Sequence, residues 1–295
     1  YRGPRLPHPT SSKPRHSNRA GPRGGVPRGD GRFWPALDSG RFMSGSAVQP
    51  GRAGKLYAMQ TPTSAGAAGQ PAGDAPLLQT VEVSTGERPD FSIIWLHGLG
   101  ADGHDFEPVV PMLGLPPGAS IRFVFPHAPV RPVTLNGGMP MRAWYDIKNL
   151  TDGRNQDEAG VEASAAAVRA LMAREVERGV PVSRQMIAGF SQGGAMALHV
   201  ALRFPERLAG LVALSSYLLF SDRLEAEASD ANRDLPTFIA HGTQDPVVAY
   251  EFGARSARHL ETLGYPVQWH SYPMPHSVSP AELVDIGRFI AARLG

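Results

Sequence analysis

The chain has 295 residues, with 29 Lys or Arg, 27 Asp or Glu and no cysteine. The lack of cysteine excludes disulfides, thiolate metal sites and a cysteine nucleophile. The longest mostly apolar stretch, residues 208–220, has 13 residues, whereas a membrane-spanning helix needs about 18 or more. We therefore expect a cytoplasmic protein without stable membrane insertion.

The first 76 residues differ in composition from the rest of the chain. They hold 11 of the 28 prolines and 13 of the 33 glycines without hydrophobic periodicity, which predicts a disordered Arg/Pro/Gly-rich extension. Residues 1–55 carry 11 Lys or Arg against two acids, so nucleic-acid or membrane binding by a basic arm is the alternative. The aromatic residues there are few and scattered, and no nucleic-acid-binding motif is present, so we expect no nucleic-acid partner.

The extension also carries two internal methionines, Met43 and Met59, in a chain that starts at Tyr1. This pattern predicts that residues 1–76 are non-native, either a mis-assigned start or an expression remnant. We expect a chain that starts at Met59 to keep its stability and activity.

From residue 77 to residue 295, apolar strand patterns alternate with helical patterns. Strands are expected at 78–83, 91–96, 121–125, 184–188, 211–214, 235–241 and 267–272, and helices at 158–178, 195–202, 251–263 and 280–294. This alternation predicts a single α/β domain in which a mostly parallel central sheet has helices on both faces.

The pentapeptide Gly189-Phe190-Ser191-Gln192-Gly193 fits the G-x-S-x-G nucleophile elbow, which holds a serine on a strained turn between a strand and a helix. The strand expected before it and the helix expected after it provide that context. The glycines keep side chains away from the crowded turn. Ser191 is therefore a candidate nucleophile.

An elbow serine needs a histidine to take its proton and a carboxylate to orient that histidine, and on this fold both follow the serine in the chain. Asp245 lies just after the strand expected at 235–241, and His276 lies in the loop after the last expected strand. The competing residues fall in a polar stretch or inside helices and strands, where solvation or packing is the ordinary role. They are Asp222, Asp230, Asp234, His199, His259 and His270.

An oxyanion hole requires the N–H of the residue after the nucleophile and a second N–H from the loop after an early strand. Gln192 and Leu99 are the candidates, because Leu99 lies in the turn His97-Gly98-Leu99-Gly100 after the strand at 91–96. His97 and His104 are interpreted as hydrogen-bonding loop residues.

The segment from Gly98 to Gly103 also fits the dinucleotide fingerprint G-x-G-x-x-G. That fingerprint needs an acidic residue about 20 positions later to bind the ribose, and no Asp or Glu lies between Glu107 and Asp146. No P-loop sequence is present either. We expect no nucleotide cofactor.

The loop expected at 126–157 is long enough to suggest a functional role. We predict that Trp144 and Tyr145 form one wall of an acyl pocket beside Leu99, and that Leu218 and Leu219 close the other side. The alternative is that these apolar residues are core or dimer contacts.

Together, these motifs resemble the carboxylesterase/phospholipase family of α/β-hydrolases, which includes the acyl-protein thioesterases. The resemblance rests on the segments 97–103, 125–129, 141–147, 189–195 and 241–245 and on His276. It implies a metal-free serine hydrolase without a cofactor, acting on a small-molecule carboxylic ester of short to medium acyl length, with a possible homodimer.

Two alternatives remain open at this point. An acyl-protein thioesterase or lysophospholipase would act on longer acyl chains, and a hydrolase fold without catalysis would serve as a binding protein. The intact set of Ser191, Asp245 and His276 argues against the second alternative.

Overall fold

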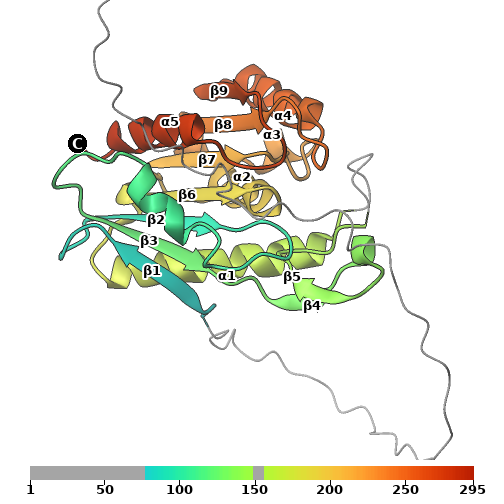
Figure 1. Ribbon diagram of the computed structural model, residues 1–295, viewed down its shortest axis with the longest axis horizontal. Helices are drawn as coiled ribbons and strands as arrows, with labels where there is room; N and C mark the ends of the chain where they lie inside the picture. The colour runs from blue at the N-terminus through green and yellow to red at the C-terminus, as the bar shows by residue number, and fades with distance from the viewer. Residues whose placement is uncertain (1–76, 149–155) are drawn as a thin grey trace, which may run out of the picture. The chain divides into compact units, whose positions relative to one another are not determined.

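A computed structural model describes residues 77–148 and 156–295, in which a seven-stranded sheet runs through the fold (Figure 1). The expectations for residues 1–76, including the disordered extension and the Met59 start, lie outside the described residues. The strands are β1 (Thr80–Ser84), β2 (Phe91–Leu96), β3 (Ile121–Pro126), β6 (Gln185–Phe190), β7 (Gly210–Leu214), β8 (Thr237–Gly242) and β9 (Val267–Tyr272).

The order of strands across the sheet is β1-β3-β2-β6-β7-β8-β9. Only β1 runs antiparallel to its neighbour β3, and the other pairs in this sheet are parallel. The prediction of a mostly parallel α/β-hydrolase sheet is therefore confirmed. The helices are α1 (Glu158–Glu177), α2 (Gln192–Arg203), α3 (Leu224–Glu227), α4 (Tyr250–Thr262) and α5 (Pro280–Ala291).

Helices cover both faces of the sheet, and the central strands are therefore buried on both sides. Ile94 and Leu96 of β2 join the core cluster that includes α1, α2 and α4. Ile93 and Trp95 of the same strand point to the opposite face and pack in the cluster that includes α5 and the 3-10 helix Glu107–Met112. No helix within residues 77–148 and 156–295 combines the length and the apolarity needed to cross a membrane.

The loop expected at 126–157 contains a short hairpin that the sequence analysis did not predict. Strands β4 (Val130–Pro132) and β5 (Pro140–Arg142) pair antiparallel and form a separate two-stranded sheet. Gly137 and Gly138 turn the chain between them with φ values of 63° and 78°, a region that glycine enters at little cost.

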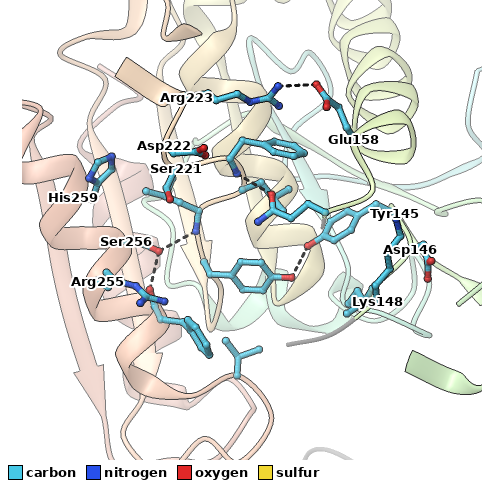
Figure 2. A pocket seen from close by; sticks show the side chains of 18 of the residues that line it. Tyr145, Asp146, Lys148, Glu158, Ser221, Asp222, Arg223, Arg255, Ser256 and His259 are labelled. Atoms are coloured by element: carbon cyan, nitrogen blue, oxygen red, sulfur yellow. Dashed lines mark hydrogen bonds and ion pairs between the residues drawn. The ribbon is translucent and has the colours of Figure 1, made fainter. Parts of the chain in front are cut away.

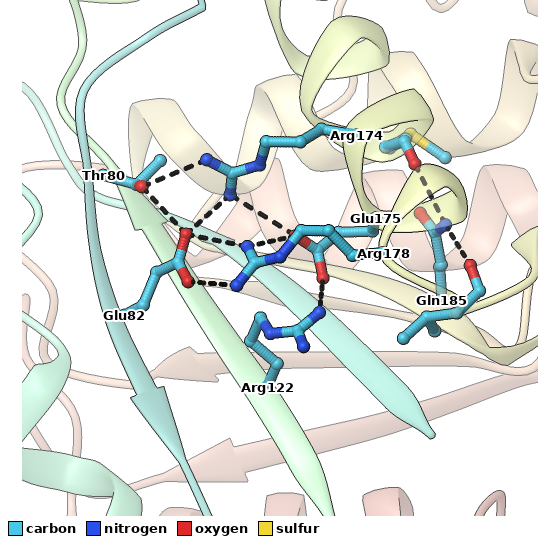
Figure 3. A network of polar contacts seen from close by, with 9 residues as sticks. Thr80, Glu82, Arg122, Arg174, Glu175, Arg178 and Gln185 are labelled. Carbon is cyan, nitrogen blue, oxygen red and sulfur yellow. Dashed lines mark hydrogen bonds and ion pairs between the residues drawn. The ribbon is translucent and has the colours of Figure 1, made fainter. Parts of the chain in front are cut away.

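A polar network ties α1 to the β1 edge of the sheet (Figure 3). The side chain of Glu175 is fully buried and contacts Arg122 at 2.7 Å and Arg178 at 2.9 Å. Arg174 and Arg178 both also reach Glu82 of β1 at 2.8 Å. A buried carboxylate is tolerated only when it is paired in this way, so these ion pairs fix the position of α1 along the sheet.

Candidate active site

The candidate residues gather at one edge of the sheet because each follows the carboxyl end of a parallel strand. Ser191 follows β6, Asp245 lies three residues after β8, His276 lies four residues after β9 and Leu99 lies three residues after β2. In α/β sheets this edge is where ligands bind.

The turn at Ser191 has the strained backbone of a nucleophile elbow. Its φ is 54° and its ψ is −118°, a positive φ that a residue with a side chain rarely adopts. A Cβ added to Gly189 would lie 2.2 Å from the Gly193 oxygen, and one added to Gly193 would lie 2.2 Å from the Leu96 oxygen. These glycines are therefore required for the close approach of β6, α2 and β2.

Three side chains form a continuous chain of hydrogen bonds from Ser191 to Asp245. The Oγ of Ser191 lies 3.0 Å from Nε2 of His276, and Nδ1 of His276 lies 2.6 Å from Oδ2 of Asp245. The ring of Phe190 packs against the His276 ring at 4.7 Å between centroids. The geometry is that of a nucleophile, a base and an orienting acid.

Asp245 is held as a carboxylate although its side chain is fully buried. Burial acts to raise the pKa of Asp245, but hydrogen bonds from His241, His276 and the Val247 N–H outweigh it and hold the pKa well below its usual range. The negative charge is thus available to orient His276 and to stabilise it when it takes a proton.

The backbone N–H groups of Gln192 and Leu99 each point away from the preceding carbonyl, which is itself hydrogen-bonded. The Ser191 carbonyl accepts the Ala195 N–H at 3.1 Å, and the N–H of Gln192, in the same trans peptide, points the opposite way. Gln192 also begins α2, where N–H groups have no carbonyl partner within the helix. In the same manner, the Gly98 carbonyl faces Nδ1 of His97 at 2.7 Å, so the Leu99 N–H is directed away from it.

His97 is a loop-forming residue, as the sequence analysis interpreted it. Its ring is buried, its Nε2 accepts the Ala128 N–H at 3.0 Å, and burial lowers its pKa to about 4. The ring is therefore neutral and carries its proton on Nδ1, facing the Gly98 carbonyl. His104, by contrast, is exposed and pairs with Glu107 at 2.9 Å.

Gln192 has a second function that the sequence analysis missed. Its side chain accepts the Trp144 N–H at 2.9 Å and donates to the Tyr145 carbonyl at 2.7 Å. The loop that carries the predicted pocket wall is thereby fixed to the first residue of α2.

A cavity of about 710 Å³ lies beside these residues (Figure 2). Tyr145, Leu218 and Leu219, three of the residues proposed for an acyl pocket, line it, whereas Leu99 is not among its described lining residues. Two lining residues connect it to the site, because the Tyr145 carbonyl bonds to Gln192 and the Val248 N–H donates to Asp245 at 2.9 Å. Neither Ser191 nor His276 is among the described residues that line the cavity, so it adjoins the triad and does not enclose it.

The prediction that Trp144 lines this pocket is wrong. Its side chain is 0% exposed and lies in the core, where the indole N–H donates to the His97 carbonyl at 2.8 Å. Trp144 and Tyr145 lie in a bend after β5 and both are buried, but only Tyr145 reaches the cavity, where its hydroxyl bonds to that of Tyr217.

The competing acids and histidines lie apart from this constellation in the structure. Asp222, Asp230 and Asp234 are exposed, His199 is buried against Glu162, and His270 stacks on Phe238. His259 lies on α4 and lines the cavity. Within the described ranges, no group of three or more His, Cys, Asp or Glu side chains is arranged to hold a metal ion.

The fold and the elbow define the class of protein, an α/β-hydrolase with a serine at the nucleophile position. Residues 79–294 match the phospholipase/carboxylesterase family, and the chain belongs to that family. As a member it is a hydrolase of the esterase and thioesterase type that acts on ester bonds.

Its relatives include proteins named acyl-protein thioesterase. Acyl-protein thioesterase 1 of Cryptococcus neoformans is 37% identical over 236 residues, covering 74% of this chain and 98% of that protein. The Neurospora crassa protein of the same name is 41% identical over 217 residues, covering 70% of this chain and 88% of that one. The crystal structure of Zea mays acyl-protein thioesterase 2 matches with a TM-score of 0.66 and 33% identity, covering 74% of this chain and 99% of that one.

Proposed function

We propose that this protein hydrolyses long-chain acyl thioesters, and the corresponding oxygen esters, through a Ser191–His276–Asp245 triad. The contact of 3.0 Å between Ser191 Oγ and His276 Nε2 is the observation that carries the proposal. The names of the relatives support a thioester substrate more than the short- to medium-chain ester expected from the motifs.

The first half of the reaction forms an acyl-enzyme. His276 removes the Ser191 proton while Oγ attacks the carbonyl carbon of the substrate. The N–H groups of Leu99 and Gln192 bind the oxygen that becomes negative, and His276 then gives its proton to the leaving thiol or alcohol.

The second half releases the acid. Water replaces the leaving group, and His276 activates it for attack on the acyl-enzyme. Asp245 keeps the proton of His276 on Nδ1 and stabilises the imidazolium that forms in both halves.

The cavity supports a large acyl group. Its volume of about 710 Å³ lies within the range of about 300 to 1,000 Å³ that is usual for ligand sites. Ile147, Leu218, Leu219, Phe252 and the half-exposed Val247 provide apolar lining. Polar and charged residues, among them Lys148, Glu158 and Arg223, line the rest of the cavity. An acyl chain bound there would remove this apolar surface from water.

A comparison of matched substrates tests the proposal. The rates of hydrolysis of p-nitrophenyl esters and of S-acylated cysteine peptides are measured for acetyl to palmitoyl chains, with Ser191→Ala as the control. We expect the highest kcat/KM with long-chain thioesters and no turnover by the variant. A maximum at short oxygen esters would instead establish a short- to medium-chain carboxylesterase. If the wild type and the variant were equally inactive on every substrate, the alternative of a hydrolase fold that acts as a binding protein would be favoured.

A further inference from the structure

His241 lies beside the triad without a role in the steps above. It is in β8, its side chain is fully buried, and its Nε2 lies 3.4 Å from Oδ2 of Asp245. The same oxygen accepts the His276 Nδ1–H at 2.6 Å. Asp245 therefore contacts two histidines through a single carboxylate oxygen.

The hydrogen bonds of His241 define its protonation. Nε2 lies 2.8 Å from the Val248 carbonyl, which can only accept, so Nε2 carries a hydrogen. Nδ1 is buried and has no partner within the described residues. A proton there would be a buried donor without an acceptor, so the ring is neutral and donates from Nε2 alone.

The ring of His241 is also fixed in place. A Cβ added to Gly253 of α4 would lie 2.2 Å from Nδ1, which shows that the helix backbone packs directly on the ring. Tyr250 approaches it edge-on at 6.0 Å between centroids. The ring therefore presents its N–H in one direction.

Several N–H groups surround the carboxylate of Asp245. The N–H groups of Val247 and Val248 bond to Oδ1 of Asp245 at 2.8 and 2.9 Å. His276 donates to Oδ2 at 2.6 Å, and Nε2 of His241 lies 3.4 Å from the same oxygen, so a fourth N–H is close to the buried carboxylate. Oδ1 is held by the backbone, and of the two histidines at Oδ2 only His241 takes no part in proton transfer.

We propose that His241 is a positioning residue for the triad: its Nε2–H, shared between the Val248 carbonyl and Oδ2 of Asp245, holds the carboxylate plane on which the orientation of His276 depends. This inference rests on the proposed function, in which Asp245 orients the base. His241 touches no reacting atom and acts through Asp245.

A pair of variants separates the N–H from the rest of the ring. His241→Gln keeps an amide donor near the position of Nε2, whereas His241→Asn is shorter by one methylene and cannot reach Oδ2. We expect His241→Asn to lower kcat about tenfold with little change in KM, as for the loss of one hydrogen bond to a charged group, and His241→Gln to restore most of kcat. His241→Leu is a second variant without the donor, for use if His241→Asn does not fold.

The matched control is His270→Asn on the neighbouring strand β9. His270 stacks on Phe238 at 4.5 Å, so this variant also removes an imidazole from the sheet but should keep kcat. If folded His241→Asn or His241→Leu has the kcat of the wild type, or if His241→Gln is as slow as they are, the inference is wrong.

A second readout does not depend on turnover. The proton between His276 Nδ1 and Asp245 gives an NMR resonance at low field, and we expect it to move or broaden in His241→Asn and to stay in place in His241→Gln. An unchanged resonance in all variants would overturn the role of His241. If the wild type hydrolyses no ester, the proposed function fails, and this resonance still tests the contact.

Discussion

The side chain of Gln192 joins the elbow helix to the backbone of Trp144, accepting its N–H at 2.9 Å and donating to the Tyr145 carbonyl at 2.7 Å. The side chain is 2% exposed. The residue proposed as an oxyanion donor through its backbone therefore also holds the loop that forms one wall of the cavity. Oxyanion binding and substrate binding are connected through one side chain.

Replacing Gln192 by Ala removes both of these hydrogen bonds but keeps the backbone N–H. We expect the free energy of unfolding to fall by about 1 to 3 kcal/mol for each buried group left unsatisfied. We also expect kcat/KM to fall more for long acyl chains than for acetyl, because the Tyr145 wall loses its support. Urea unfolding and the acyl-length profile measure the two effects, and an unchanged profile would show that the loop holds its position without Gln192.

The positive φ of Ser191 predicts a difference between two inactive variants. Ser191→Ala and Ser191→Gly both remove the nucleophile, and each should lower turnover on the order of 10⁶-fold. Only glycine adopts a φ of 54° without strain. We expect Ser191→Gly to be more stable than Ser191→Ala by about 1 kcal/mol, since relief of the strain exceeds the added chain entropy.

Urea unfolding of the two Ser191 variants side by side provides the test. If the alanine variant is equally stable or more stable, the elbow does not store strain at this residue.

Much of the fold and of this site can be predicted from the sequence because each functional residue follows a recognisable strand pattern, which is mostly apolar in β2, β6 and β8 and alternating in β9. Ser191, Asp245 and His276 are separated in the chain, but their strands β6, β8 and β9 end at the same edge of a parallel sheet. The rule that ligands bind at that edge is enough to bring them together.

Other features depend on contacts that a linear pattern does not contain. The hairpin of β4 and β5 consists of three-residue strands with a proline in each, too short to show alternation. The position of Trp144 depends on hydrogen bonds to His97, 47 residues earlier, and to Gln192, 48 residues later. The sequence pattern predicts only that His241 belongs to a strand. The turn of the chain after β8 brings Asp245 close to its side chain.

The low pKa of Asp245 predicts a dependence of stability on pH. A carboxyl whose pKa is lowered in the folded protein stabilises it above the unfolded-state pKa of about 3.9, and this contribution is lost as the pH falls toward the folded-state pKa. The wild type should therefore lose more free energy of unfolding than Asp245→Asn when the pH is lowered from about 5 to about 2.

The same variant should lose turnover at about pH 7 on the order of 10⁴-fold, as with the acid of other triads, because an amide no longer selects the Nδ1–H form of His276. Denaturant unfolding at a series of pH values and kcat at neutral pH are the measurements. Parallel stability profiles for the two proteins would mean that Asp245 is not held as a charged group.

The distinction between core and cavity predicts opposite outcomes for two aromatic residues, Trp144 in the core and Tyr217 in the cavity wall. Trp144 is fully buried and donates to the His97 carbonyl, so Trp144→Phe should lower the free energy of unfolding by about 1 to 3 kcal/mol and leave the shape of the acyl-length profile unchanged. Tyr217 lines the cavity, and its hydroxyl bonds to that of Tyr145 at 2.9 Å. Tyr217→Ala should therefore alter the preferred acyl length.

Tyr217→Phe is the matched control, because it removes only the hydroxyl and keeps the wall. Relative kcat/KM values from acetyl to palmitoyl esters, measured for the three variants, decide between the two roles. A changed profile in Trp144→Phe together with an unchanged one in Tyr217→Ala would mean that the acyl chain binds elsewhere, because the cavity wall would then have no influence on chain length while a core residue did.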